Sequence, residues 1–145
     1  LRYCMLTDVD KERDVMSNTH INLTEAEWSV MECLWDFSPR TGREVTEAMA
    51  EKEGWNRSTT LTLLSRLESK GAVSSNSDGS KKVFCAVLRR DDAAIQETES
   101  FLGRVYKGSL SLMVNAMTKK KALSKNEIQE LYELLKELEG GDENA

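Results

Sequence analysis

A polar helix followed directly by a basic hairpin is the feature that most restricts how this chain can fold. Residues 55–73 have the sequence WNRSTTLTLLSRLESKGAV, and DGSKKVF follows at 78–84. Asn56 is a favoured N-cap residue and Gly71 is a favoured helix-ending residue, so one helix is predicted between them. Four of its residues recur at helical spacing and are expected to face a core: Thr60, Leu63, Leu64 and Leu67.

The segment after this helix is predicted to form a β-hairpin. Asp78-Gly79 is the strongest turn signal in the chain, within an expected turn at 76–80. The flanking residues predict two short strands, at about 72–75 and 81–88. The second strand begins with two lysines, which makes the hairpin basic.

Two further helices precede the polar helix. Thr24 with Glu27, and Thr41 with Glu44, form capping-box patterns in which the hydroxyl and the carboxylate each accept a free backbone amide. Pro39 is expected to end the first of these helices, and a glycine ends the second. Three helices followed by a basic hairpin is the order of a winged helix-turn-helix domain.

The C-terminal part is predicted to form three more helices with more apolar surface than they can bury alone. The segment at 108–118 is apolar on nearly all sides, which is unusual for a surface helix. Ser124 with Glu127 forms a third capping box, and Gly140 is expected to end the last helix. A small three-helix unit buries little surface, so packing against a second copy is expected. The predicted homodimer contacts are Phe101, Leu102, Tyr106, Leu110, Met113, Val114, Met117, Ile128, Leu131 and Leu135.

These patterns together predict a mainly α fold with two folded parts. A winged helix-turn-helix DNA-binding domain is expected at 21–90, followed by a three-helix C-terminal dimerisation region at 91–140. Residues 1–20 are expected to be a disordered leader and residues 141–145 a disordered tail.

Charge is distributed unevenly along the chain. The formal net charge is −5, which by itself disfavours nucleic acid, but residues 40–90 contain ten basic and six acidic residues. This segment therefore carries +4 and the rest of the chain −9. A basic segment in an acidic protein is typical of a local surface for polyanions.

The polar face of the predicted helix at 57–70 has the residue types needed to contact DNA. The second helix of a helix-turn-helix pair enters the major groove, where short polar side chains allow close approach and arginine binds guanine or phosphate. Hairpin lysines would lie along the DNA backbone or minor groove. The predicted DNA contacts are Arg57, Ser58, Thr59, Thr62, Arg66, Lys81 and Lys82.

The same residues have a simpler explanation as solvated surface. The domain would then be a winged-helix module for protein interaction, without specific DNA binding. The +4 charge of the segment favours DNA, and a salt-dependent shift of duplex DNA would separate the two hypotheses.

Other function classes lack support in the sequence. The three cysteines are widely spaced and odd in number, which argues against a disulfide framework and indicates a reducing, cytoplasmic location. Cys33 and Cys85 are expected to be small core residues, since His20 is the only histidine and no metal-chelating spacing occurs. No phosphate loop, nucleophile elbow or transmembrane span is recognisable. We therefore expect no enzymatic activity, no cofactor, no metal and no membrane partner.

Four segments together resemble the penicillinase-repressor family, also called BlaI/MecI/CopY, over about residues 21–140. They are LTEAEWSVMECLW at 23–35, WNRSTTLTLLSRLESKG at 55–71, FLGRVYKGSLSLMV at 101–114 and LSKNEIQELYELL at 123–135. The resemblance implies a bacterial repressor that binds an inverted-repeat DNA operator as a dimer.

The resemblance also implies how repression would be relieved. Members linked to β-lactam resistance are cut between Asn and Phe, and the corresponding bond here is Ser100-Phe101. A protease linked to a sensor is thus an expected partner. In the alternative, Phe101 is only a core residue, and a ligand or another signal relieves repression. One departure concerns packing, because Thr60 stands where the family usually has Val or Ile.

Overall fold

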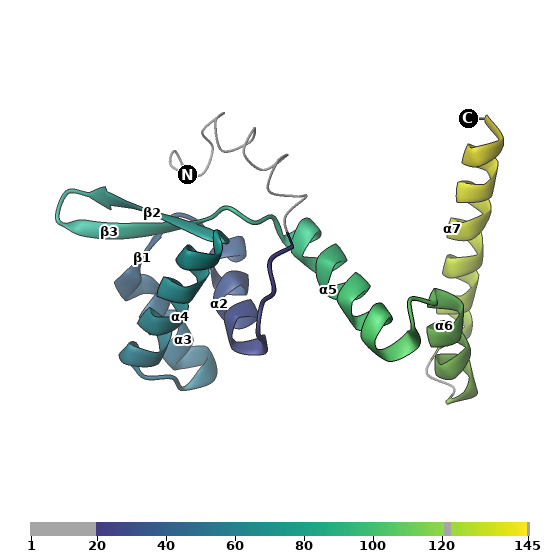
Figure 1. Ribbon diagram of the computed structural model, residues 1–145, viewed down its shortest axis with the longest axis horizontal. Coiled ribbons are helices and arrows are strands. Elements are labelled where there is room, and N and C mark those ends of the chain that lie inside the picture. Colours follow the sequence, from purple (N-terminus) through teal and green to yellow (C-terminus); the bar gives the residue numbers. More distant parts are fainter. Residues whose placement is uncertain (1–19, 121–122, 145) are drawn as a thin grey trace. The chain divides into compact units, whose positions relative to one another are not determined.

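The computed structural model describes residues 20–120 and 123–144 and divides into two compact units, one ending at Thr98 and one beginning at Glu99. Three helices and a β-hairpin make up most of the first unit (Figure 1). Its elements are α2 (Glu25–Asp36), β1 (Arg40–Thr41), α3 (Gly42–Glu53), α4 (Arg57–Lys70), β2 (Val73–Asp78), β3 (Lys81–Ala86) and the start of α5 (Arg90–Tyr106). The predicted mainly α, winged-helix fold is confirmed, whereas nearly all of the predicted leader lies outside the described residues.

Capping boxes fix the beginnings of α2 and α3, as predicted. The Thr24 hydroxyl accepts the N–H of Glu27 at 3.1 Å, and the Glu27 carboxylate accepts the N–H of Thr24 at 2.8 Å. Thr41 and Glu44 make the same reciprocal pair, at 3.1 and 2.9 Å. Each box satisfies two backbone donors that a helix start leaves without intrahelical partners.

Helix α4 also begins and ends at the predicted residues. The Asn56 side chain accepts the N–H of Thr59 at 2.8 Å, which makes Asn56 the N-cap. Gly71 ends the helix with φ 86°, and its N–H bonds to the carbonyls of Leu67 and Glu68. A glycine suits this left-handed position because it has no Cβ to clash.

The inner faces of α2, α3 and α4 and the hairpin enclose one core. The four predicted α4 positions are all buried, with Thr60 and Leu67 at 0% exposure. The core side chains from the other elements include Val30, Met31, Leu34, Val45, Met49, Val73 and Phe84. This packing leaves the opposite face of α4 in solvent.

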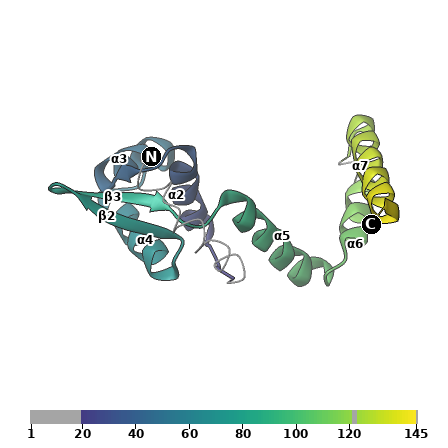
Figure 2. The same cartoon turned by 90° about the horizontal axis from the view of Figure 1, so that it is seen from above.

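The hairpin forms two strands of a three-stranded antiparallel sheet with the order β1-β3-β2. Asp78 pairs with Lys81, so the turn is tighter than the expected turn at 76–80, and β2 extends through residues predicted as loop. Strand β1 was not predicted, because Arg40 and Thr41 acquire strand geometry only by pairing with β3. In Figures 1 and 2 the hairpin, here called the wing, projects beyond the helices.

An ion pair between the buried Glu27 and the partly exposed Lys70 joins the start of α2 to the end of α4. Glu27 is 1% exposed, and its carboxylate lies 2.6 Å from the Lys70 ammonium, which also donates to the Asn22 carbonyl at 2.7 Å. Burial raises the pKa of Glu27, but hydrogen bonds from Lys70 and Thr24 outweigh it, and the pKa lies below its ordinary value. The pair therefore helps to hold α4 against α2.

The two described cysteines of the first unit differ in state. Cys33 is buried and free, and burial raises the pKa of its thiol. Cys85 is buried, as predicted, but it is disulfide-bonded, which the argument against disulfides from cysteine count and spacing did not predict. Residue count and spacing could not show this, because a disulfide depends on distance in the folded chain.

The second unit contains the end of α5, α6 (Leu110–Lys119) and α7 (Lys125–Asn144). Ser109 caps α6 by accepting the N–H of Leu112, and Ser124 accepts the N–H of Glu127 near the start of α7. Helix α7 continues past Gly140, where its end was predicted, as far as Asn144 in the predicted tail. A glycine in a helix costs only about 1 kcal/mol and so does not by itself end one. Within the described residues, no helix is long and apolar enough to cross a membrane.

Candidate nucleic-acid interface

The exposed face of α4 forms a continuous strip of polar side chains. Arg57, Ser58, Thr62 and Arg66 all lie along one shallow groove, which Leu61 and Ser65 complete. Thr59 is exposed as well but does not line this groove. We call the exposed polar residues 57, 58, 59, 62, 65 and 66 the recognition face.

The predicted hairpin lysines lie at the beginning of β3, and both are exposed. The Lys82 ammonium is 3.7 Å from the Glu68 carboxylate and 5.4 Å from the centroid of the Phe84 ring. Both side chains of this ion pair are exposed, so the pair is weak. Hydrogen bonds to Thr41 hold the pKa of Glu44 below its ordinary value, and the charges of Arg40 and then Lys81 lower it further.

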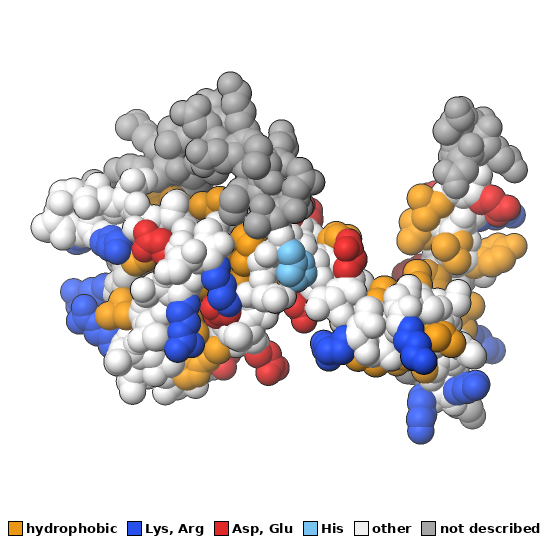
Figure 3. Space-filling view, in the orientation of Figure 1, with side chains coloured by type: hydrophobic (Ala, Val, Ile, Leu, Met, Phe, Trp, Pro, Cys, Tyr) orange, Lys and Arg blue, Asp and Glu red, His pale blue; other side chains and the backbone are white. Residues whose placement is uncertain are grey.

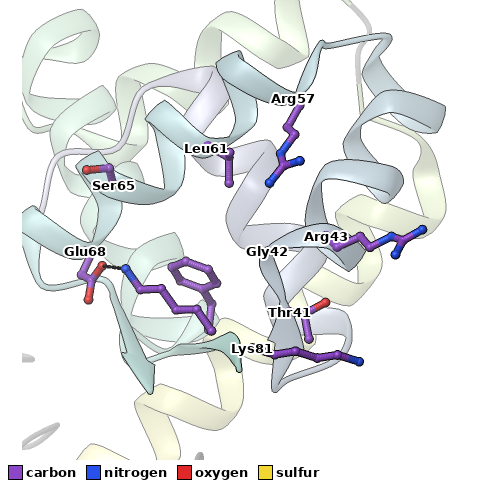
Figure 4. A pocket seen from close by; sticks show the side chains of 10 residues that line it. Thr41, Gly42, Arg43, Arg57, Leu61, Ser65, Glu68 and Lys81 are labelled. Carbon is purple, nitrogen blue, oxygen red and sulfur yellow. Dashed lines mark ion pairs between the residues drawn. The ribbon is translucent and has the colours of Figure 1, made fainter. Parts of the chain in front are cut away.

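A second cavity, here called the wing pocket, lies between α3, α4 and β3 and has a volume of about 580 Å³ (Figure 4). It brings Arg57 and Ser65 of α4 close to both hairpin lysines. Thr41, Gly42, Arg43, Leu61, Glu68 and Phe84 complete its lining. The recognition face and the wing pocket therefore adjoin, and Arg57 and Ser65 belong to both.

Two residues at this surface were missed by sequence reasoning. Ser65 lies three positions after Thr62, so the helical period alone could have placed it on the recognition face. No local sequence pattern could have placed Arg43 at this surface, because α3 meets the wing only through the tertiary fold. Figure 3 shows lysine and arginine side chains gathered at the left edge of the first unit, below the wing.

The predicted dimerisation residues all belong to the second unit, where many large apolar side chains are exposed. In α6, whose ten residues are all described, none is buried. Leu110 is 54% exposed, Ile128 49% and Leu135 54%. Met117 and Phe101 are also exposed, whereas Leu102, Tyr106, Met113, Val114 and Leu131 are partly covered.

The predicted cleavage position lies within α5. Ser100 is exposed and Phe101 is 38% exposed, with its ring edge-on to Tyr106 at a centroid distance of 5.9 Å. The boundary between the two compact units falls just before it, after Thr98. Phe101 is thus a partly packed aromatic residue on an accessible helix.

Among the described residues, no group of three or more His, Cys, Asp or Glu side chains is arranged to hold a metal ion. The cavities at α4 and the wing instead present arginine, lysine and hydroxyl groups. These groups donate hydrogen bonds to anions and to base edges. The chemistry of this surface is therefore that of binding to a polyanion.

Comparison with known proteins gives consistent matches over most of the chain. The penicillinase repressor family model matches residues 23–137. The methicillin resistance regulatory protein MecI of Staphylococcus aureus strain N315 is 28% identical over 120 residues, covering 83% of this chain and 98% of MecI. The penicillinase repressor of Bacillus licheniformis is 33% identical over 115 residues, covering 79% and 90% of the two chains.

One similar solved structure is that of monomeric Bacillus licheniformis BlaI in complex with the blaP half-operator. It has a TM-score of 0.46 and 27% identity, and the match covers 51% of this chain and 90% of that chain. The family model itself spans well over half of the sequence, from α2 to α7. The chain therefore belongs to the penicillinase repressor family.

Proposed function

We propose that the protein is a transcriptional repressor that binds duplex DNA through the recognition face and the wing. The observation that carries the proposal is the placement of Arg57, Thr62 and Arg66 on one exposed face of α4, next to the wing lysines. A helix of this width fits the major groove, and the wing cations suit the adjacent phosphates. Similarity to a protein named a penicillinase repressor, and to one named a methicillin resistance regulatory protein, supports the same function.

We further propose that two copies bind together, through the second unit. Helices α6 and α7 expose many large apolar side chains, among them Leu110, Leu112, Ile128, Leu134, Leu135 and Leu138. Clustered exposed apolar residues mark protein interaction sites. Each leucine that becomes fully buried against a partner contributes about 1.5–3 kcal/mol. A two-fold symmetric dimer would match an inverted-repeat operator, because each copy then contacts one half-site.

Selection of DNA duplexes from a random pool tests the proposal and does not require the operator sequence. The full chain is expected to enrich an inverted repeat, and anisotropy measurements should show tighter binding to it than to a scrambled duplex. Failure to enrich any sequence, with weak and equal binding to all duplexes, would favour the protein-interaction module instead.

We propose that release of the operator follows cleavage between Ser100 and Phe101 by a protease linked to a sensor. A cut there leaves the first unit without α6, α7 and most of the proposed dimer contacts. Two linked DNA-binding domains gain about 10²–10⁴ in affinity from bivalent binding, and cleavage would remove that gain. The bond lies in a helix, so α5 must unwind locally before it fits an extended protease cleft.

Intact-mass measurement of the repressor from inducer-treated cells tests this route. Cleavage predicts an N-terminal fragment ending at Ser100. A full-length protein that has left its operator would exclude cleavage and leave Phe101 as a packing residue. In either case, the proposed site of action is the cytoplasm, where the DNA lies.

A further inference from the structure

The wing pocket combines an apolar floor with a cationic rim. Phe84, at 5% exposure, and Leu61 supply the floor. A Cβ placed on Gly42 would lie 3.5 Å from the Phe84 ring and 3.7 Å from the Leu61 side chain, so the glycine backbone closes over these two residues. Figure 4 shows Arg57 and Leu61 directed from α4 toward the start of α3. The result is a concave site with an aromatic surface at its base.

The rim carries more positive than negative charge. Arg43, Arg57, Lys81 and Lys82 line the pocket together with a single carboxylate, Glu68. Glu68 lies 3.7 Å from Lys82, and Arg43 is paired outside the pocket with Glu47 at 3.1 Å. Among the described residues, no carboxylate lies within ion-pairing distance of Arg57. Arg57 is therefore available to bind an anion at the mouth of the pocket.

The apolar floor distinguishes this pocket from a simple phosphate-binding site. A phosphodiester needs the cations of the rim but gains nothing from an aromatic ring below them. A volume of about 580 Å³ lies within the range of small-molecule sites, which are mostly apolar with a few placed polar groups. An aromatic ring can pack on Leu61 and beside Phe84, whose ring centroid lies 5.4 Å from the Lys82 ammonium, while an attached carboxylate meets Arg57.

We propose that the wing pocket binds a small aryl carboxylate, which competes with DNA. Arg57 holds the carboxylate, and the ring occupies the floor between Leu61 and Phe84. Because Arg57 and Lys81 are shared with the proposed DNA contacts, a bound ligand blocks their approach to phosphate. The regulatory effect rests on the proposed DNA-binding function, whereas binding to the pocket does not.

A titration of the isotopically labelled full chain with 2-naphthoate, without DNA, tests the site. The amide resonances of Gly42, Leu61 and Phe84 are expected to shift, with a dissociation constant on the order of 0.1–1 mM. Two comparison compounds separate the contributions: 2-naphthylmethanol has the ring without the charge, and inorganic phosphate has the charge without the ring. Both are expected to bind at least about tenfold more weakly.

Arg57→Ala and Arg66→Ala form a matched pair of variants. Both residues are exposed on α4, but only Arg57 lines the wing pocket. Arg57→Ala should weaken the binding of 2-naphthoate about tenfold, which is the factor expected for the loss of one charge-assisted hydrogen bond. Arg66→Ala should leave it unchanged. With DNA present, 2-naphthoate at ten times its dissociation constant should raise the apparent dissociation constant for a selected duplex about tenfold.

Several results would overturn the proposal. They are shifts confined to residues outside the pocket, equal binding of 2-naphthoate to the two arginine variants, and phosphate binding as tight as that of 2-naphthoate. The last result would indicate that the pocket binds the phosphate backbone of DNA. A chain that binds 2-naphthoate as described but no DNA would contradict the proposed function and leave the ligand site standing.

Discussion

Replacing Thr60 by valine should stabilise the first unit. Thr60 is 0% exposed, and among the described residues its hydroxyl has no hydrogen-bond partner. A buried hydroxyl without a partner costs about 1–3 kcal/mol, because it has lost its bonds to water. Valine has nearly the same shape and a similar helix propensity, so the substitution removes this cost without adding volume to the core. We expect the free energy of unfolding to rise by about 1–2 kcal/mol.

Thr46→Val provides a matched control. Thr46 is also buried on a helix, at 8% exposure, but its hydroxyl donates to the Arg43 carbonyl at 2.8 Å. Removing a satisfied hydrogen bond should destabilise the unit by about 1 kcal/mol. The two identical substitutions are thus expected to have opposite signs.

Urea unfolding of the full chain, followed by tryptophan fluorescence at fixed protein concentration, measures both changes. Trp28 and Trp35 report on the first unit, since their rings contact each other edge-on at 5.0 Å. Thermal unfolding should shift by about 4–8 °C for each kcal/mol in a unit of this size. A Thr60→Val variant that is less stable than the wild type would refute the claim that this hydroxyl is unsatisfied.

Three further predictions concern acid stability, assembly and cleavage. Because the pKa of Glu27 is depressed in the folded state, its contribution is complete above the ordinary value of 4.5 and is lost as pH falls through the folded pKa. Wild-type urea midpoints should therefore fall more steeply below that pH than those of Glu27→Gln, and parallel curves would exclude a role for the Lys70 pair. Replacing Met113 and Leu131 by Asp should yield monomers in sedimentation, and a monomeric wild type at micromolar concentration would contradict the dimer. Replacing Phe101 by Ala should abolish the inducer-dependent fragment, and continued cleavage at this bond would exclude Phe101 as its determinant.

The helix beginnings were predictable because their signals are local. Thr24 and Glu27 are three residues apart, so the sequence contains the whole capping interaction. The buried face of α4 was predictable for the same reason, since helical periodicity places Leu63, Leu64 and Leu67 together.

The contacts that were missed connect residues far apart in the chain. Glu27 and Lys70 come from opposite ends of the three-helix core, and neither residue type indicates that the two form an ion pair. The contribution of Arg43 to the wing pocket depends on how α3 meets β3. The division into two domains remains a prediction, and so do the DNA contacts and the dimer contacts. Each of these depends on a binding partner or on function.

The most direct test of the account is the salt dependence of DNA binding by three proteins: the wild type, Lys81→Ala and Arg66→Ala. A wing lysine that contacts phosphate should strengthen binding to all sequences about equally, and its loss should reduce the slope of log K against log salt by about 1. Arg66→Ala should instead cost about 1–3 kcal/mol on the selected operator and relax specificity at one position.

Lys125→Ala is the control for charge alone, because this exposed lysine lies on α7, outside the proposed interface. It should bind like the wild type, with an unchanged slope. Equal slopes for Lys81→Ala, Lys125→Ala and the wild type, together with an undiminished preference of Arg66→Ala for the operator, would contradict DNA recognition by α4 and the wing.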